Sequence, residues 1–364
     1  MYNISLFNLP RGFDRDLNLL LFSMAARRVA MGFLQVVRAI YFALLGFSPF
    51  TIGLLLSVAT VVSAFHHISF GVLSDRYGRK PFLLLGTIFA TCRLVIFATT
   101  RNFWLIAFGQ GLGAMGEGAG AGQPVVSGYI TDKVDVKKRV SVFSTLAITN
   151  AFAASLGSMM AGLPQLFQNL IGVDLVSAHV PLFLIGVIFS VLSFIFLLPI
   201  SDVAPVEEEK FKEDQRALKI KSWGVILKFS LVRSTSGLGW GLIESLLTLY
   251  FFIRFATGSD VLGLIFAAAR LTSILTYLLV PFIVAKFSEI RTLTLSRILS
   301  ACVTVTLVLT NRYFLAAVLL IILWLLLMFT APIRQSFATG IVDPDETATA
   351  IGISNFARMG VRSV

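Results

Sequence analysis

The chain has 364 residues, of which 57% are hydrophobic and 13% charged, and its mean hydropathy is +0.87. Soluble domains are about half apolar and a quarter charged, whereas here the apolar excess lies in blocks of about 20 residues, long enough to cross a bilayer. This composition excludes the soluble classes of protein. The net charge of +11 does not indicate a nucleic-acid partner, because Lys and Arg fall mostly in the short segments between the apolar blocks.

The apolar blocks predict ten membrane spans, all helical because lipid offers no partner to unpaired backbone groups. They cover residues 19–45, 52–74, 82–100, 103–130, 140–163, 180–200, 228–253, 260–285, 292–310 and 313–341. Residues 347–364 begin an eleventh span, so we expect a chain truncated within its eleventh transmembrane helix.

A polar stretch at 201–222 divides the chain into an N-terminal six-helix bundle (1–200) and an incomplete C-terminal bundle (223–364). The two parts share short matches at nearly constant offsets. Gly32, Gln35 and Tyr41 match Gly241, Glu244 and Tyr250, and residues 148–150 match 353–355. These matches predict a duplicated helical unit.

Basic residues are distributed unequally between alternate loops. One set of loops holds Arg76, Arg79, Lys80, Lys133, Lys137, Lys138, Arg139, Lys210, Lys212, Arg216, Lys219, Lys221, Lys286 and Arg291, and the opposite set holds Arg101, Arg254 and Arg312. Because basic loops remain in the cytoplasm, we expect the first set and the N-terminus to be cytoplasmic in a multi-pass protein of the cell membrane.

The segment between the second and third predicted spans carries the most specific pattern. Residues 71–80 read Gly-Val-Leu-Ser-Asp-Arg-Tyr-Gly-Arg-Lys. They resemble the signature loop of the major facilitator superfamily (MFS), Gly-x-x-x-Asp-Arg-x-Gly-Arg-Lys, in residue type, spacing and position. Residues 128–132, 332–335, 342–346 and 355–358 resemble other parts of the same family, so the resemblance covers essentially the whole chain. The overall pattern is similar to prokaryotic permeases and efflux proteins.

The resemblance implies an all-α fold of two pseudo-repeated six-helix bundles around a central cavity with alternating access. The loop would then be a conformational gate formed by Gly71, Asp75, Arg76, Gly78, Arg79 and Lys80. Gly78 permits a tight turn, and Asp75 can face a helix N-terminus or an arginine. We expect the basic residues of the loop to anchor it at the anionic inner leaflet.

Two patterns of the family are missing. Ala107 stands where many proton-coupled members have an arginine in the fourth span. Residues 157–162, Gly-Ser-Met-Met-Ala-Gly, lack the proline and one glycine of the fifth-span motif of drug antiporters. Both departures weaken an inference of proton antiport.

Ionisable side chains within a span are costly and indicate functional sites. The spans contain Arg27, Arg28, Arg38, Arg93, Glu117, Arg233, Glu244, Arg270, Arg297 and Arg334. In the family that the chain resembles, the first, fourth, seventh and tenth helices line the cavity. The substrate or coupling candidates are therefore Arg38, Glu117, Glu244 and Arg334, and the first three are expected to share one layer by their depth.

The other intramembrane arginines have structural explanations. Arg233 and Arg297 are expected to extend toward the membrane surface, and Arg27 and Arg28 either do the same or face the cavity. Arg93 is expected to form a structural ion pair, because the third span usually lies outside the cavity.

No G-x-x-x-x-G-K-[ST] segment and no metal-ligand spacing occur in the sequence, so we expect no enzyme activity, cofactor or metal. The first expectation is a secondary active transporter that exports a small organic solute, with a proton or another ion as a coupling partner. Uptake of a sugar or an organic anion is the alternative. A non-transporting membrane sensor or truncated remnant is the alternative from another class.

Overall fold

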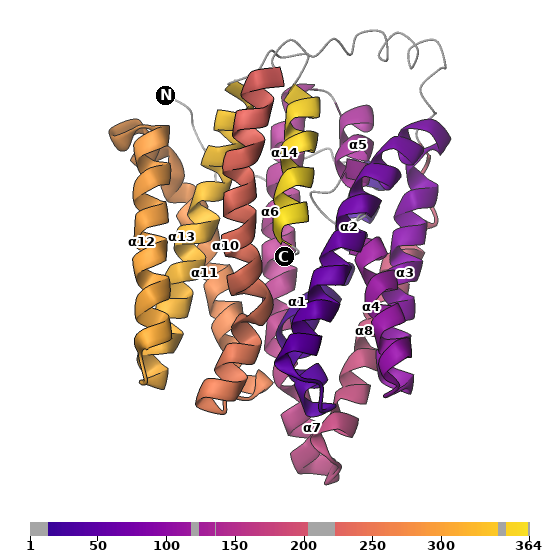
Figure 1. Cartoon of the computed structure of the whole chain (residues 1–364). Helices are drawn as coiled ribbons and strands as arrows, with labels where there is room; N and C mark the ends of the chain where they lie inside the picture. Colours follow the sequence, from indigo (N-terminus) through magenta and orange to yellow (C-terminus); the bar gives the residue numbers. More distant parts are fainter. Residues whose placement is uncertain (1–13, 118–123, 135, 203–222, 341–346, 363–364) are drawn as a thin grey trace.

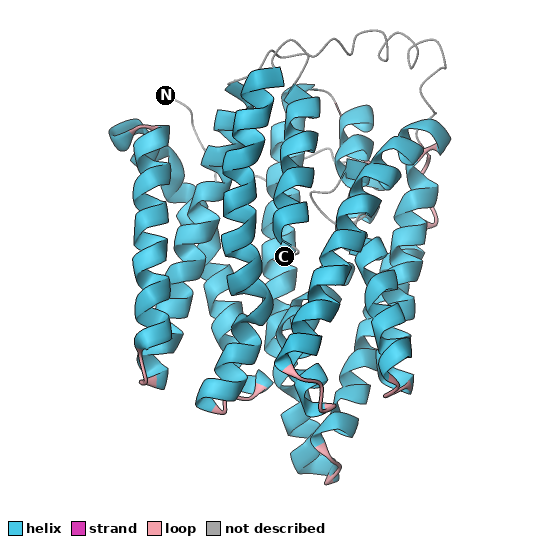
Figure 2. Ribbon diagram, in the orientation of Figure 1, coloured by secondary structure: helices cyan, strands magenta, loops and turns pink. Residues whose placement is uncertain are grey.

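The computed structural model of the chain describes residues 14–117, 124–134, 136–202, 223–340 and 347–362. These ranges contain helices and no strand, and the helices run side by side in one bundle (Figures 1 and 2). The helices are α1 (Arg15–Leu44), α2 (Pro49–Tyr77), α3 (Arg79–Thr99), α4 (Phe103–Glu117), α5 (Pro124–Lys133), α6 (Val136–Met159), the 3-10 helix η1 (Met160–Gly162), α7 (Leu163–Ile171), α8 (Leu175–Leu197), α10 (Trp223–Phe255), α11 (Ser259–Phe287), α12 (Glu289–Leu309), α13 (Tyr313–Gly340) and α14 (Thr347–Arg362).

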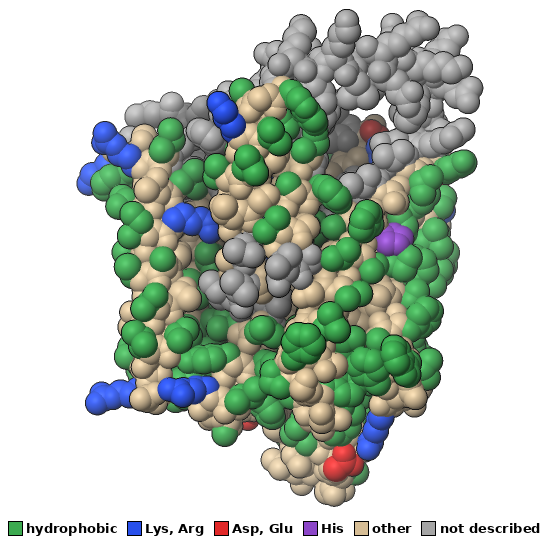
Figure 3. All heavy atoms as spheres, viewed as in Figure 1, with side chains coloured by type: hydrophobic (Ala, Val, Ile, Leu, Met, Phe, Trp, Pro, Cys, Tyr) green, Lys and Arg blue, Asp and Glu red, His purple; other side chains and the backbone are tan. Residues whose placement is uncertain are grey.

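The predicted all-α membrane fold is confirmed. Seven of the described helices are long and apolar enough to cross a membrane. Large hydrophobic side chains cover much of the visible outer surface (Figure 3). The exposed large hydrophobic residues include Ile188 on α8 and Val305 on α12. Such a surface is costly in water and suits contact with lipid tails.

Two elements differ in detail from the predicted spans. The predicted span 103–130 corresponds to two helices, α4 and α5, and residues 118–123 between them lie outside the described part. The short helix α7 was not predicted, and it projects beyond the neighbouring helix ends (Figure 1). Its limits have local causes, because Pro164 suits a first helical turn and Gly172, with a φ of 73°, ends the helix in the left-handed region.

We call the end of the bundle where α1 begins and α8 ends the linker end, and the end where α1 ends and α2 begins the far end. In the first half, α1 packs against α6 and α8, and α3 packs against α4 and α8. In the second half, α10 packs against α14, and α13 packs against α11 and α12. The halves meet where α11 packs against α6, α10 against α1, and α14 against α2.

Equivalent contacts in the two halves confirm the repeat. The Tyr41 hydroxyl on α1 donates a hydrogen bond to the Phe97 carbonyl on α3, and the Tyr250 hydroxyl on α10 donates to the Val308 carbonyl on α12. The match of Gly32 to Gly241 also reflects equivalent contacts. A Cβ on Gly32 would collide with the backbone of α6, and a Cβ on Gly241 would collide with the backbone of α14. The sequence matches therefore mark places where two helices approach closely.

Two apolar clusters lie at different ends of the bundle. The cluster at the far end joins the halves, with Ile40 and Phe97 from the first half and Phe251 and Phe266 from the second. The cluster at the linker end consists of residues from α1, α2, α3, α5 and α6 with the end of α8, all in the first half. The described halves therefore share a hydrophobic core at the far end.

Candidate functional site

The predicted gate loop is a one-residue junction between two helices. Helix α2 ends at Tyr77, α3 begins at Arg79, and Gly78 between them has a φ of 93°. Residues that carry a side chain rarely adopt this backbone conformation, which explains the need for glycine at this position. A Cβ at Gly78 would also lie 2.5 Å from a carboxylate oxygen of Asp202.

Asp202, the fifth residue after the end of α8, binds the start of α3. Its Oδ1 atom accepts a hydrogen bond of 3.0 Å from the backbone N–H of Lys80. A carboxylate is favourable at this position because the first N–H groups of a helix lack partners within the helix. The junction is thus held from the side by the segment that follows the sixth predicted span.

The Arg79 side chain binds other side chains of the protein. Its Nε lies 3.0 Å from Oδ2 of Asp132, and its Nη1 donates a 2.9 Å hydrogen bond to the Ser74 hydroxyl. The guanidinium lies against Gly128, where a Cβ would collide with it. The sequence predicted that Arg79 anchors the loop to lipid headgroups. In the structure, the planar guanidinium of Arg79 instead donates to groups on α2 and α5 and so joins these two helices to α3.

Other members of the predicted gate are described less fully. Gly71, Asp75 and Arg76 lie in α2, but their side-chain positions are outside the described part of the structure. Their roles remain predictions.

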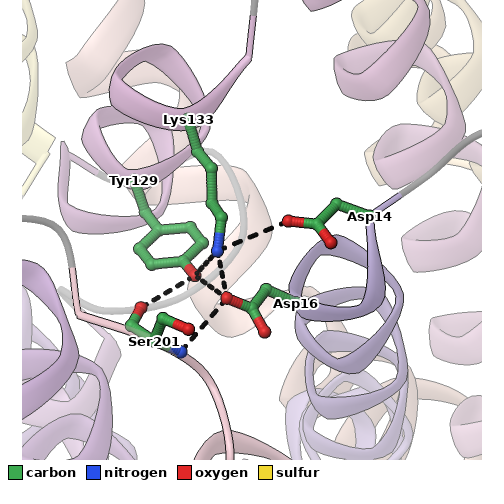
Figure 4. Close-up of polar contacts among 5 residues, drawn as sticks. All are labelled: Asp14, Asp16, Tyr129, Lys133 and Ser201. Atoms are coloured by element: carbon green, nitrogen blue, oxygen red, sulfur yellow. Dashed lines mark hydrogen bonds and ion pairs between the residues drawn. The ribbon is translucent and has the colours of Figure 1, made fainter.

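A polar cluster beside this loop joins three parts of the first half (Figure 4). It consists of Asp14 and Asp16 at the start of α1, Tyr129 and Lys133 on α5, and Ser201 after α8. The ammonium of Lys133 donates to Asp16 and lies 3.6 Å from Asp14. The backbone N–H of Ser201 also donates to Asp16, at 3.1 Å, and the Tyr129 hydroxyl donates to the Ser201 carbonyl at 3.1 Å.

The electrostatics of this cluster favour the ion pair. Burial alone would lower the pKa of Lys133, at the end of α5, but hydrogen bonds to Asp16 and Tyr129 outweigh burial and raise that pKa above its usual value. The side chains of Asp16 and Lys133 are 9% and 22% exposed, so water screens the pair only in part. We interpret the cluster as structural, because each partner is already held by another member.

The predicted layer of Arg38, Glu117 and Glu244 is only partly described. Arg38 is half-buried on α1, whereas the side chains of Glu117, Glu244 and Arg334 lie outside the described part. The shared layer of these three residues therefore remains a prediction.

Two other arginines lie beside the stretch of α4 that leads to Glu117. Arg27 is 5% exposed and donates to the Gly116 carbonyl, so it is not extended toward the membrane surface. Arg93 is 1% exposed, and its Nη2 lies 3.1 Å from the sulfur of Met31 while its side chain covers Gly113. Both guanidinium groups converge on residues 113–116 from α1 and α3, an arrangement that the depth estimate did not predict.

Arg270 on α11 connects the two halves through three hydrogen bonds. Its Nη1 donates to the Ala154 carbonyl at 2.8 Å and to the Ser158 hydroxyl at 2.6 Å, both on α6. Its Nη2 donates to the Gln35 side-chain oxygen on α1 at 2.5 Å. The sequence identified Arg270 as an intramembrane charge but did not include it among the site residues, because the eighth span was not expected to line the cavity. The signal available in the sequence was the match of Gln35 to Glu244, because Gln35 is the residue on α1 that Arg270 contacts.

A further polar residue was missed on α4. Gln110 is 1% exposed, and both polar atoms of its amide lack a hydrogen-bond partner among the described residues. A buried amide without partners is costly, so this position is unfavourable in a purely structural helix contact. The described bundle thus contains buried polar groups besides the four predicted candidates.

The chain belongs to the Major Facilitator Superfamily, whose sequence profile matches residues 19–364. It is 27% identical over 212 residues to an uncharacterized transporter of Buchnera aphidicola, which is 57% of this chain and 49% of that protein. It is 25% identical over 187 residues to the class C tetracycline resistance protein of Escherichia coli, which is 50% of this chain and 40% of that protein. The matched regions thus span less than half the length of these relatives.

Solved structures agree on the fold. A bacterial homolog of the human lysosomal transporter Spinster, in an inward-facing and unoccupied conformation, superposes with a TM-score of 0.73 at 17% identity and covers 95% of this chain and 79% of its own. A mutant of the nucleoside transporter NupG gives a TM-score of 0.76 at 14% identity and covers 96% and 89%. At these identities the likeness establishes the fold alone.

Proposed function

We propose that this MFS protein is a secondary active transporter that moves a small solute across the cytoplasmic membrane by alternating access. The observation that carries the proposal is the junction of the halves. They share a hydrophobic core at the far end, while Arg270 joins them by hydrogen bonds roughly midway along α11. Polar groups held between two repeated bundles at mid-depth are typical of transporter binding sites.

The proposed orientation places the linker end in the cytoplasm, with the N-terminus on the same side. Its support is the excess of basic residues in the loops of that end. With this orientation the shared core closes the outer side, which corresponds to an inward-facing state. A cysteine introduced at Lys137 is then expected to react with an impermeant maleimide only in inverted vesicles, and a cysteine at Arg312 only in intact cells. Labelling of the Lys137 cysteine in intact cells would refute the orientation.

Export of an organic compound is the proposed direction and substrate class. Its support is the likeness to a tetracycline resistance protein. The second candidate is uptake of a sugar or an organic anion, which the number of arginines in the spans favours for anions. A non-transporting sensor would show binding without flux.

A flux experiment separates these possibilities. The purified chain is reconstituted in liposomes, and exchange of labelled tetracycline, uridine, xylose and succinate is measured against protein-free liposomes. We expect exchange of at least one compound above the protein-free rate, and an exporter is expected to accumulate its compound in inverted vesicles. Binding of a compound without exchange would contradict the transporter proposal and support the sensor.

A further inference from the structure

Gln35 is an unusual residue of α1. Its neighbours Leu34 and Val36 are each 1% exposed, whereas the Gln35 side chain is exposed. The partly or fully exposed positions 28, 31, 35 and 38 recur every three or four residues, so they lie along one face of the helix. Because Gln35 also contacts α11 of the second half, this face of α1 is directed toward the space between the halves.

Gln35 and Arg270 lie near the middle of the membrane. Gln35 precedes the end of α1 by nine residues, and Arg270 follows the start of α11 by 11, which corresponds to about 14 and 16 Å from the far end. The hydrocarbon core of a bilayer is about 30 Å thick. This depth is where solute sites lie in transporters built from repeats.

The hydrogen bonds of Arg270 divide its guanidinium into two sides. Nη1 is held by α6 through hydrogen bonds to the Ala154 carbonyl and the Ser158 hydroxyl. Nη2 binds the amide oxygen of Gln35, whose side chain is exposed and able to move away. A neutral amide oxygen is also a weaker acceptor for guanidinium than a carboxylate.

We propose that Gln35 and Arg270 form an anion subsite, in which a carboxylate of the solute replaces the Gln35 oxygen on Nη2 of Arg270. This inference rests on the proposed transporter function and narrows its substrate class to organic acids. Ala154 and Ser158 keep the guanidinium oriented while the solute binds. The solute then contacts the second half through Arg270 and lies against α1 of the first half, so its binding and release depend on how the halves are arranged.

The competing explanation is that Arg270 and Gln35 form a purely structural contact between the halves. Ser155 on α6 donates to the Ala267 carbonyl, and Ser259 on α11 donates to Gln165 on α7, so the same interface has hydrogen bonds that need no solute. What distinguishes the Arg270 contact is a full charge at mid-membrane and an exposed partner. A purely structural contact needs neither, and the charge of Arg270 would be costly to bury without a function.

The test compares acids with their amides. Unfolding temperature of the purified full chain in nanodiscs is measured with benzoate and benzamide, nicotinate and nicotinamide, and succinate and succinamide, at millimolar concentrations and constant ionic strength. We expect at least one acid to raise the unfolding temperature while its amide does not. The shift is expected to disappear in Arg270→Gln and to persist in Arg312→Gln, an exposed arginine at the far end.

A second variant keeps the test valid if Arg270→Gln does not fold. Gln35→Glu places the protein's own carboxylate beside Nη2, so it is expected to abolish the acid-dependent shift by competition, whereas Gln168→Glu on α7 is expected to retain it. The subsite is refuted if no acid shifts the unfolding temperature, if the amides act equally, or if the shift survives in Gln35→Glu. Exchange of a neutral solute without any acid effect would refute the subsite alone, and acid binding without flux would refute the transporter.

Discussion

The Gly78 junction gives a prediction whose magnitude follows from the structure. In Gly78→Ala the backbone must keep a φ of 93° and a ψ of 156°, which costs about 1–3 kcal/mol for a residue with a side chain. The new Cβ would also lie 2.5 Å from Asp202 and displace its carboxylate from the Lys80 N–H. That hydrogen bond to a charged group is worth about 1.5 kcal/mol or more. We expect the free energy of unfolding to fall by roughly 3 kcal/mol.

Unfolding by SDS in mixed micelles, followed by circular dichroism, measures this change. Gly46→Ala is the matched control, because Gly46 also has a positive φ of 86° but nothing lies within 4 Å of its Cβ position. Gly46→Ala should lower the free energy of unfolding only by the backbone contribution. In Gly78→Ala the Asp202 bond is already disrupted, so adding Asp202→Ala should cost little more. Equal losses in the two glycine variants, or strictly additive losses in the double variant, would refute the reasoning.

Three further predictions concern charged side chains. Asp75→Asn is expected to insert normally but to reduce flux at equal abundance, because the charge proposed to hold the gate is lost; unchanged flux would remove this role. Glu117→Gln is expected to abolish uphill transport while exchange persists, and full rescue by also neutralising Arg38 would instead indicate a structural pair. Lys133→Met leaves the buried Asp16 without its ammonium and should lower the free energy of unfolding by about 2 kcal/mol relative to the exposed Lys228→Met control, measured by SDS unfolding.

The helices were predictable because lipid imposes a simple rule on the sequence. A span needs about 20 apolar residues, and turns between spans are short and polar. The repeat was predictable from Gly32, Tyr41 and their matches because the same close approach and the same hydroxyl bond recur in both halves. Helix α7 was missed because nine residues are too few for a span, and its amphipathic pattern follows the fifth span without a charged boundary.

The site was harder to predict because depth along a helix does not determine the direction of a long side chain. Arg27 was expected either to extend toward the membrane surface or to face the cavity, yet it is buried against α4. Arg270 was undervalued for the same reason. Its guanidinium reaches across the junction of the halves to Gln35, and only tertiary structure brings residues 235 positions apart within hydrogen-bond distance.

The polar cluster around Asp16 has a consequence for biosynthesis. Its members lie between residues 14 and 201, and the bond from Ser201 to Asp16 joins the first helix to a residue 185 positions later. All partners are therefore synthesised before α10. Because chains assemble from the N-terminus during synthesis, the cluster can form as soon as α8 has been inserted. The first half then presents a finished template, with α1 already fixed, on which the later helices are assembled.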